Sequence, residues 1–258
     1  MKSLRITLLL AALVLIANVG NAQNTSKQKS STSQPVEPEM VFVERGTFMM
    51  GCTSKQGNCS SWEKPAHWVT VDSFYIGKYE VTQAQWKAVM GNNPSHSKGD
   101  KLPVENVSWN EVQAFISKLN AQTGKQYRLP TEAEWEFAAR GGNKSENYNY
   151  SGSNIAARVS WNTYNSGDKS RIVGTKSSNE LGIHDMSGNV YEWCNDWYGN
   201  YGSEPQLNPQ GPSSGEYRVA RGGSWSDFAE RACVWSRIFG APDDRDISMG
   251  FRLACSSK

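Results

Sequence analysis

Four oxygen donors fall close together between Gly182 and Trp193. The carboxylates of Asp185 and Glu192 flank a turn, and the backbone carbonyls of Gly188 and Val190 lie between them in the chain. A hard divalent cation such as calcium takes about six to eight oxygen ligands, drawn from carboxylates and from carbonyls of irregular backbone. These residue types at this spacing predict a metal site whose ligands are Asp185, Gly188, Val190 and Glu192.

The same stretch also fits a purely structural turn. Ser187, Gly188 and Asn189 combine a hydroxyl, a glycine free to adopt positive φ and an asparagine that can bond its own backbone. Tyr191 and Trp193 then alternate as they would on a buried strand. From this stretch alone, a cation site and an ordinary turn before a strand both stay open.

Thiol chemistry is the second possibility that the residue types raise. The five cysteines are Cys52, Cys59, Cys194, Cys233 and Cys255. Because the count is odd, at least one thiol is free or bonded to another molecule. Cys52 and Cys59 close a short polar loop, and we expect this pair to form a disulfide in an oxidising compartment. No C-x-x-C and no H-x-x-x-H spacing occurs, which disfavours zinc.

The first 22 residues have the pattern of a secretory signal peptide. Lys2 and Arg5 precede an apolar run too short to span a membrane, and small residues at 20–22 suit cleavage. We therefore expect an exported protein that is periplasmic, at the cell surface or secreted, with no membrane span after signal removal. Residues 23–38 follow as a flexible leader, because they have too few apolar side chains to form a core.

The charge balance argues against nucleic acid as a partner. The chain has 27 Lys and Arg residues and 25 Asp and Glu residues, a net charge of +2. Residues 1–22 contain two of the basic residues and no acidic one, so the exported part has 25 of each sign. A neutral domain has no basic surplus for a phosphate backbone or for an anionic membrane surface.

The elements that must position these groups begin with strands and continue with helices. Four short stretches have a strand-like pattern, at 40–43, 46–51, 69–71 and 74–76. Three helices each open with a capping box and continue with apolar residues at helical spacing, and the box residues are Thr82, Ser108 and Thr131. Glycines at 91, 124 and 141–142 end these helices. Their aromatic residues are expected in the core.

The second half of the sequence has long loops and three closing strands. The loops run over 143–180 and 197–215, and the strand-like segments are 217–219, 232–237 and 250–253. Six arginines in this half alternate with acidic residues that include Asp227, Glu230 and Asp243, which favours ion pairs over an anion site. No break in composition divides the chain after the leader, so we predict one domain over residues 39–256.

Four motifs occur in a fixed order along this domain. They are Arg128-Leu129-Pro130-Thr131-Glu132-Ala133-Glu134-Trp135-Glu136, Gly188-Asn189-Val190-Tyr191-Glu192-Trp193, Arg221-Gly222-Gly223-Ser224-Trp225 and Gly250-Phe251-Arg252. In this order they resemble the formylglycine-generating enzyme, or sulfatase-modifying factor, family, and the likeness covers nearly the whole exported chain. The resemblance implies a single α+β domain of the C-type lectin-like kind with little regular secondary structure. It also implies structural calcium at Asp185, Gly188, Val190 and Glu192.

Catalytic members of that family oxidise a cysteine of an unfolded sulfatase with O2 and a copper(I) ion held by two thiolates. The two thiols follow the Gly-Gly-Ser-aromatic motif, and here Cys233 matches the second. The first position falls at Asp227 or Phe228, depending on the direction of counting, and neither is a soft ligand. The resemblance therefore makes Cys233 a catalytic candidate without a partner thiol, and it makes copper an unexpected cofactor for this chain.

Three functions follow as expectations. The first is a non-catalytic, calcium-stabilised binding or assembly module associated with a cell envelope or secretion system, whose partner is a protein or a glycan. The second is a divergent cysteine-dependent oxidase that uses Cys233 and acts on exported proteins. The third is a calcium-dependent glycan-binding module, suggested by the lectin-like fold and by the Tyr and Trp residues of the long loops.

Overall fold

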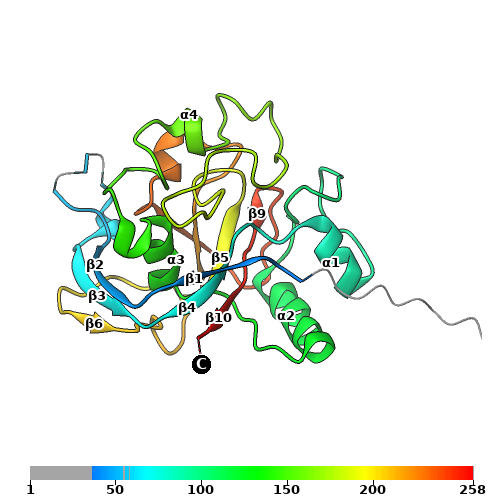
Figure 1. The fold of residues 1–258 in the computed structure, drawn as a ribbon, viewed down its shortest axis with the longest axis horizontal. Helices are drawn as coiled ribbons and strands as arrows, with labels where there is room; N and C mark the ends of the chain where they lie inside the picture. The colour runs from blue at the N-terminus through cyan, green and yellow to red at the C-terminus, as the bar shows by residue number, and fades with distance from the viewer. Residues whose placement is uncertain (1–36, 55, 58, 258) are drawn as a thin grey trace, which may run out of the picture. The chain divides into compact units, whose positions relative to one another are not determined.

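The computed structural model describes residues 37–54, 56–57 and 59–257, which form short elements joined by long loops (Figure 1). The α-helices of this part are α1 (Gln83–Met90), α2 (Trp109–Thr123), α3 (Glu132–Ala139) and α4 (Ala156–Val159). The 3-10 helices are η1 (Ser61–Glu63), η2 (Gly142–Lys144) and η3 (Ala229–Ala232). The predicted signal peptide and residues 23–36 of the predicted leader lie outside the described residues. Among those described, no helix is long and apolar enough to cross a membrane.

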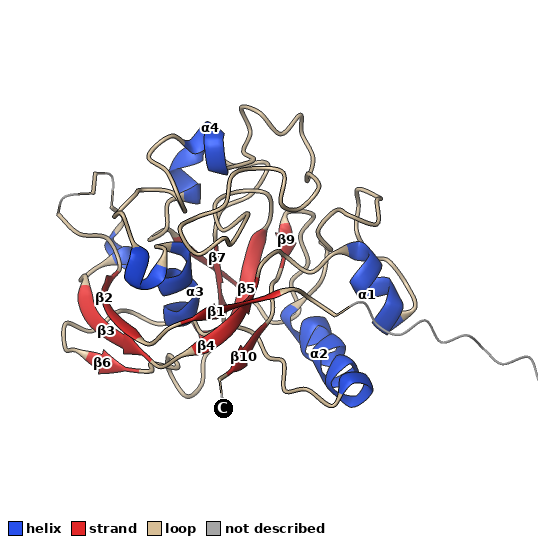
Figure 2. Cartoon of the chain, in the orientation of Figure 1, coloured by secondary structure: helices blue, strands red, loops and turns tan. Residues whose placement is uncertain are grey.

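The described strands form three small sheets (Figure 2). The first has the order β1 (Met40–Val43), β4 (Phe74–Gly77), β10 (Ala254–Ser256). The second has the order β2 (Gly46–Met50), β3 (His67–Val71), β6 (Gln206–Leu207). The third has the order β8 (Arg237–Gly240), β7 (Arg218–Arg221), β5 (Tyr191–Trp197), β9 (Met249–Gly250). Helices and strands are thus mixed without a βαβ repeat, and the α+β prediction is confirmed.

The three predicted helices begin where the capping boxes place them. The side chains of Thr82, Ser108 and Thr131 each accept a hydrogen bond from the backbone N–H three residues later. Gly91 and Gly124 end α1 and α2 in the left-handed conformation, which costs a glycine little. The end of α3 differs from the prediction, because Arg140 closes that helix in a right-handed conformation before Gly141.

Two groups of buried side chains hold these elements together. Trp86 of α1 and Phe115 of α2 stack at 5.2 Å between ring centroids, and Phe251 packs edge-on against both. In the other group, α3 packs against β2 and β3, where Phe137 contacts Phe48 with centroids 5.2 Å apart. The helical aromatics therefore belong to the core, as the apolar spacing predicts.

The closing strands differ from the prediction at two places. In the segment predicted as a strand at 250–253, β9 (Met249–Gly250) ends at Gly250 and β10 (Ala254–Ser256) starts at Ala254, so residues 251–253 lie in no strand. The segment predicted as a strand at 232–237 is instead the end of η3 followed by a turn, in which the N–H of Ser236 donates to the carbonyl of Cys233. The strand of this region, β8, starts only at Arg237. The error has a local cause, because the mixed apolar and polar pattern of 229–236 does not distinguish a strand from a tight 3-10 turn.

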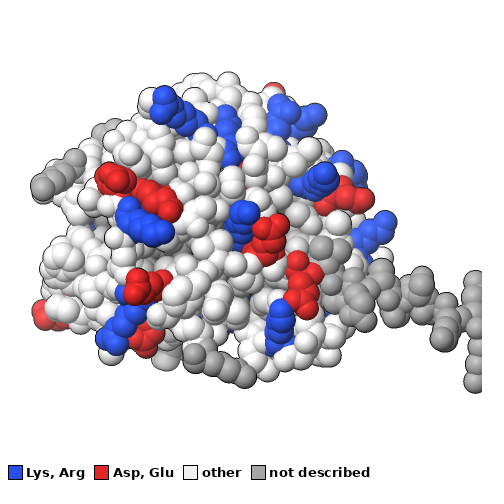
Figure 3. Space-filling model, viewed as in Figure 1, with Lys and Arg blue, Asp and Glu red and all other residues white. Residues whose placement is uncertain are grey.

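The surface carries both signs of charge. On the face drawn in Figure 3, acidic and basic side chains lie side by side at several places. The surface ion pairs of the described residues include Arg45 with Asp72 and Arg245 with Glu111. The even charge count of residues 23–258 thus has a counterpart on the folded surface.

Candidate functional site

The turn before β5 is built from backbone conformations that few residue types adopt. Asp185, Gly188 and Asn189 have φ values of 59°, 79° and 65°. A Cβ atom on Gly188 would lie 2.3 Å from the carbonyl oxygen of Trp161, so only glycine fits there. The N–H of Gly188 donates to the carbonyl of Gly222 at 2.7 Å. The turn is therefore fixed against the Gly-Gly segment that precedes the cysteine region.

The two predicted carboxylate ligands of this turn have different surroundings. Glu192 is completely buried and accepts two hydrogen bonds of 2.6 Å from Arg252 and one of 2.7 Å from the Trp135 indole. Asp185 accepts one hydrogen bond of 2.5 Å from the N–H of Gly174 through Oδ2. Its Oδ1 is buried and has no hydrogen-bond partner. The structure thus brings both residues to one place but leaves only Asp185 with a free oxygen.

A third carboxylate, Glu80, lies in the same cluster and was not predicted from the sequence. It accepts hydrogen bonds from the Asn189 side chain at 2.7 Å and from the N–H of Val190 at 3.2 Å. Burial raises the pKa of Glu80 well above its usual range, and the charge of Asp185 raises it further. Burial also raises the pKa of Asp185, to about 6, although Arg252 opposes this shift. The cluster therefore contains more carboxylates than cations.

These residues fit a divalent cation in part. The orphaned Asp185 oxygen and the surplus of buried carboxylates are features that a cation would satisfy. However, Arg252 and Trp135 already bond both oxygens of Glu192. Within residues 37–257, as far as they are described, no group of three or more His, Cys, Asp and Glu side chains has the arrangement of a metal site. A cation at this turn would consequently depend on backbone carbonyls such as those of Gly188 and Val190.

A second buried ion-pair network joins α3 to β7 and β8. Arg221 is completely buried and donates to Glu132 at 3.1 Å and to Glu136. Arg237 donates to Glu132 at 2.6 Å, and Arg140 donates to Glu136 at 2.7 Å. Of the six arginines, Arg221 and Arg237 pair with glutamates of α3, while Arg245 pairs with Glu111 and Arg252 with Glu192. Their acids therefore differ from the neighbouring acidic residues that the sequence suggested. The spacing of Glu132 and Glu136, one helical turn apart, was the available signal.

The five cysteines differ in bonding and in burial. Cys52 and Cys59 form the predicted disulfide, and Cys194, Cys233 and Cys255 are free. Burial raises the pKa of Cys233 to about 12, and burial raises the pKa of Cys194 well above its usual range. Burial also raises the pKa of the half-buried Cys255. Burial therefore disfavours the thiolate form of all three.

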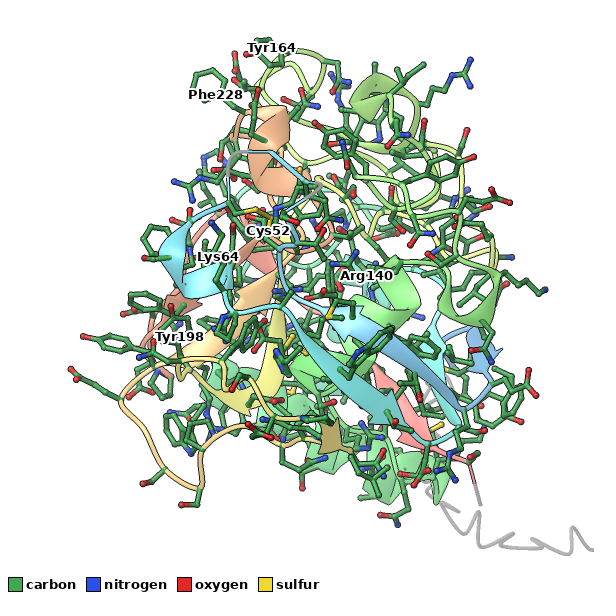
Figure 4. All side chains as sticks on the ribbon, turned by 90° about the vertical axis from the view of Figure 1, so that its left-hand side faces the viewer. Cys52, Lys64, Arg140, Tyr164, Tyr198 and Phe228 are labelled. Carbon is green, nitrogen blue, oxygen red and sulfur yellow. A yellow bond between two sulfur atoms is a disulfide. The ribbon has the colours of Figure 1, made fainter. Side chains whose placement is uncertain are left out.

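The two residues at the predicted position of the first thiol make other contacts. The carboxylate of Asp227 accepts a hydrogen bond from the Ser224 hydroxyl. Phe228 is 62% exposed, and its ring lies 5.8 Å from the ring of Tyr164, which is 71% exposed. Figure 4 shows these two side chains together at one edge of the domain. The segment before Cys233 thus presents an exposed aromatic pair where the resemblance would place a reactive thiol.

Comparison with known proteins identifies the class of domain that this fold and this site define. Residues 25–257 match the family described as the sulfatase-modifying factor enzyme 1-like domain. The chain belongs to this family, and the single-domain prediction is confirmed.

Individual relatives of the chain have different names. The chain is 37% identical to the chaperone protein LppX of Paenibacillus barcinonensis, over 82% of this chain and 86% of that one. It is 30% identical to the formylglycine-generating enzyme of Mus musculus, over 84% of this chain and 74% of that one. It is also 30% identical to the serine/threonine-protein kinase pkn1 of Chlamydia pneumoniae, but it spans only 40% of that protein's length.

A solved structure supports the fold directly. Treponema denticola variable protein 1 superposes with a TM-score of 0.78 at 34% identity, covering 84% of this chain and 95% of that one. The relatives of this chain are therefore variously named as an enzyme, a chaperone and a variable protein. Membership by itself does not fix the function of this chain.

Proposed function

We propose that the domain is a non-catalytic binding or assembly module of an exported protein. The observation that carries the proposal is the thiol set: Cys233 is a buried free cysteine, and Asp227 and Phe228 stand where the resemblance places the first thiol. Copper-dependent oxidation of a cysteine requires two soft donors, because one thiolate neither holds copper(I) firmly nor sets its geometry. The fold is otherwise complete, with its buried ion pairs intact.

The relatives support a binding role for the retained fold. LppX of Paenibacillus barcinonensis, 37% identical over most of both chains, is named as a chaperone. A chaperone binds another polypeptide without changing it chemically. By analogy, we propose a protein of the cell envelope or of a secretion system as the partner of this chain, and the interspersed surface charges argue against nucleic acid.

Mass spectrometry can distinguish a non-catalytic module from a cysteine-dependent oxidase. The purified protein and its Cys233→Ser variant are incubated with a peptide of the form Cys-x-Pro-x-Arg, copper and O2, beside an active formylglycine-generating enzyme as the positive control. We expect no formylglycine from either form. Conversion by the native protein that the serine variant loses would replace the module with a divergent oxidase.

A glycan is the second candidate partner, and the exposed pair of Tyr164 and Phe228 favours it. Aromatic faces at the surface stack on the apolar faces of sugar rings, and the two rings lie 5.8 Å apart on neighbouring loops. A glycan array read with and without a chelator tests this candidate against a protein partner. A signal that disappears with the chelator and in Phe228→Ala would support it, and an array without signal would remove it.

Export is part of the proposal and has its own test. The positively charged start, the apolar run and the small residues at 20–22 predict cleavage before Gln23. Cell fractionation followed by N-terminal sequencing of the recovered protein would give a chain that begins at Gln23, outside the cytoplasmic fraction. An uncleaved chain in the cytoplasm would refute the export prediction and leave the binding role to be tested separately.

A further inference from the structure

A cavity separate from the cysteine segment lies where β3, α3, β5 and β8 meet the loop 199–212. Its volume is about 300 Å³. Its lining includes His67 of β3, Asp196 of β5, Arg237 of β8 and Tyr201 of the loop. None of its described lining residues comes from 222–236, so it is independent of Cys233 and of the exposed aromatic pair.

The cationic group of this cavity is already neutralised. Arg237 is 2% exposed, and it donates through Nε and Nη2 to Glu132 at 2.7 and 2.6 Å. Its Nη1 donates to the carbonyls of Trp62 and Gly199. The Tyr201 hydroxyl also donates to Glu132, at 2.9 Å. The donors of Arg237 and the Tyr201 hydroxyl are therefore used within the protein, which leaves this guanidinium little with which to bind an anion.

Acceptors of the wall are in contrast incompletely used. Asp196 is 4% exposed, and it accepts one hydrogen bond of 3.0 Å, from the N–H of Glu132 to its Oδ2. No described residue donates to its Oδ1. The Nδ1 of His67 lies 3.1 Å from the carbonyl of Pro65, which can only accept, so Nδ1 carries a proton. In its ionised form Asp196 therefore offers an unused carboxylate oxygen to a ligand that donates hydrogen bonds.

The protonation of Asp196 depends on the charges around it. Burial and the nearby Glu132 raise the pKa of Asp196 to about 8, with a further contribution from Glu134, while Arg237 opposes the shift. A positive charge beside Asp196 would offset this repulsion and ionise the carboxyl group. The charged and titratable groups that face Asp196 or the cavity are His67 of β3, Glu132 and Glu134 of α3, Tyr201 of the loop, Arg218 of β7 and Arg237 of β8.

We propose that this cavity binds an ammonium or guanidinium group, with the carboxylate of Asp196 as its counter-ion. The volume is at the lower end of the range for ligand pockets, about 300–1,000 Å³, and it suits one long cationic side chain or a small amine. Such a group can come from a free amine or from a Lys or Arg of a partner polypeptide. The chemistry that recognises it is the same in both cases.

Calorimetry with four probes tests the proposal. They are n-butylammonium, the Nα-acetyl methylamides of lysine and arginine, and the matching norleucine compound, which lacks the charge. We expect at least one cationic probe to bind the native protein at least tenfold more tightly than the norleucine compound. Tighter binding of an amino-acid probe than of butylammonium would indicate a partner side chain, and the reverse would indicate a free amine. At pH 7, binding should release a proton, measured as a heat that differs between buffers.

Variants separate Asp196 from general effects on the fold. Asp196→Asn keeps an oxygen that can accept the N–H of Glu132, and we expect it to weaken cation binding at least tenfold and to abolish proton release. Glu204→Gln removes an exposed carboxylate outside the cavity wall and should leave binding unchanged. Gln210→Trp, at an exposed position of the wall, should block the cavity without disturbing the core.

Three results would overturn the proposal: no cationic probe binds up to millimolar concentration, the norleucine compound binds as well as the cations, or a folded Asp196→Asn binds as well as the native protein. None of these results depends on the formylglycine assay, because that assay reports on Cys233 and the cavity does not contain it.

Discussion

At the residue scale, the molecule depends on carboxylate and guanidinium groups that have no contact with water. Arg252 and Glu192 are both 0% exposed, and two hydrogen bonds of 2.6 Å join them. Arg252 also donates to the carbonyls of Gly77 and His184, so all of its main donors are used. A buried ion pair is tolerated only when its hydrogen bonds are complete, because removal of one partner leaves an uncompensated charge.

Breaking this pair from one side should strongly destabilise the domain. We expect Arg252→Met to lower the free energy of unfolding by about 3–5 kcal/mol, because Glu192 then remains buried without a counter-charge. Urea unfolding followed by fluorescence measures the change. Arg245→Met is the matched control, since Arg245 and Glu111 form a similar pair at the surface, and it should cost less than about 1 kcal/mol. Equal costs for the two variants would contradict the assigned role of burial.

Asp196 should make stability depend on pH in an unusual direction. Its folded-state pKa of about 8 lies above the unfolded value of about 3.9, so the folded state keeps a proton that the unfolded state releases. The free energy of unfolding therefore falls as pH rises between about 4 and 8, by up to about 1.4 kcal/mol per unit for this group. We expect Asp196→Asn to remove this contribution, so that the variant gains relative to the native protein up to about pH 8. If the free energies of unfolding of the variant and of the native protein instead change with pH in the same way across this window, the raised pKa of Asp196 is contradicted.

At the element scale, short segments have their places because particular residues fix their ends. Strand β5 follows a turn in which Gly188 approaches the backbone of Trp161, and β5 then pairs with β7 and β9. Helix α3 starts at the Thr131 capping box and carries Glu132 and Glu136 beneath β7 and β8. The start of α3 thus sets which of its glutamates can reach the arginines of β7 and β8.

A glycine pair within one segment can test this reasoning. Gly182 and Gly188 have φ values of 80° and 79°, but a Cβ on Gly182 meets nothing within 4 Å, whereas one on Gly188 meets the Trp161 carbonyl at 2.3 Å. Both alanine variants bear the left-handed strain, about 1–2 kcal/mol. We expect Gly188→Ala to cost several kcal/mol beyond Gly182→Ala, as measured by thermal and urea unfolding. Similar costs would mean that backbone strain alone explains both positions.

The sequence is informative about local structure and less so about pairing. The capping boxes at Thr82, Ser108 and Thr131 are complete within four residues, so the helix starts are readable from the sequence. Arg252 and Glu192 are 60 residues apart, and nothing in either motif says that they meet. Glu80 joins the cluster from a distance of 109 residues to Asn189. Such partners are determined by the fold, which only the family resemblance could supply in advance.

At the scale of the whole molecule, long loops are held by a few fixed points. The loop 143–180 contains only η2 and α4, and Asn179 within it donates to the carbonyl of Ala138 at 2.8 Å. The N–H of Gly174 reaches Asp185 in the turn before β5. A cation bound at that turn would therefore stabilise both the turn and the loop that contacts it, which is the structural role we propose for calcium.

Calcium should accordingly raise the melting temperature of the domain. A ligand present at about 100 times its dissociation constant stabilises a folded protein by about 2.7 kcal/mol. We expect millimolar calcium to raise the melting temperature by several degrees, EGTA to reverse this, and Asp185→Asn to abolish the response. Asp72→Asn, at an exposed residue away from the turn, serves as the control. A melting temperature indifferent to calcium and EGTA would argue that the Glu80, Asp185 and Arg252 cluster is stable without a metal.

The strand order of the first sheet has a consequence for how the protein is made. β4, from residues 74–77, lies between β1 and β10. β5 pairs with β9, and Glu192 of β5 forms an ion pair with Arg252. A chain still attached to the ribosome, with residues 249–256 inside the exit tunnel, lacks two strands and the counter-charge of Glu192. Folding can therefore finish only after these residues have left the tunnel, because β4 and β5 each lack a neighbouring strand until then.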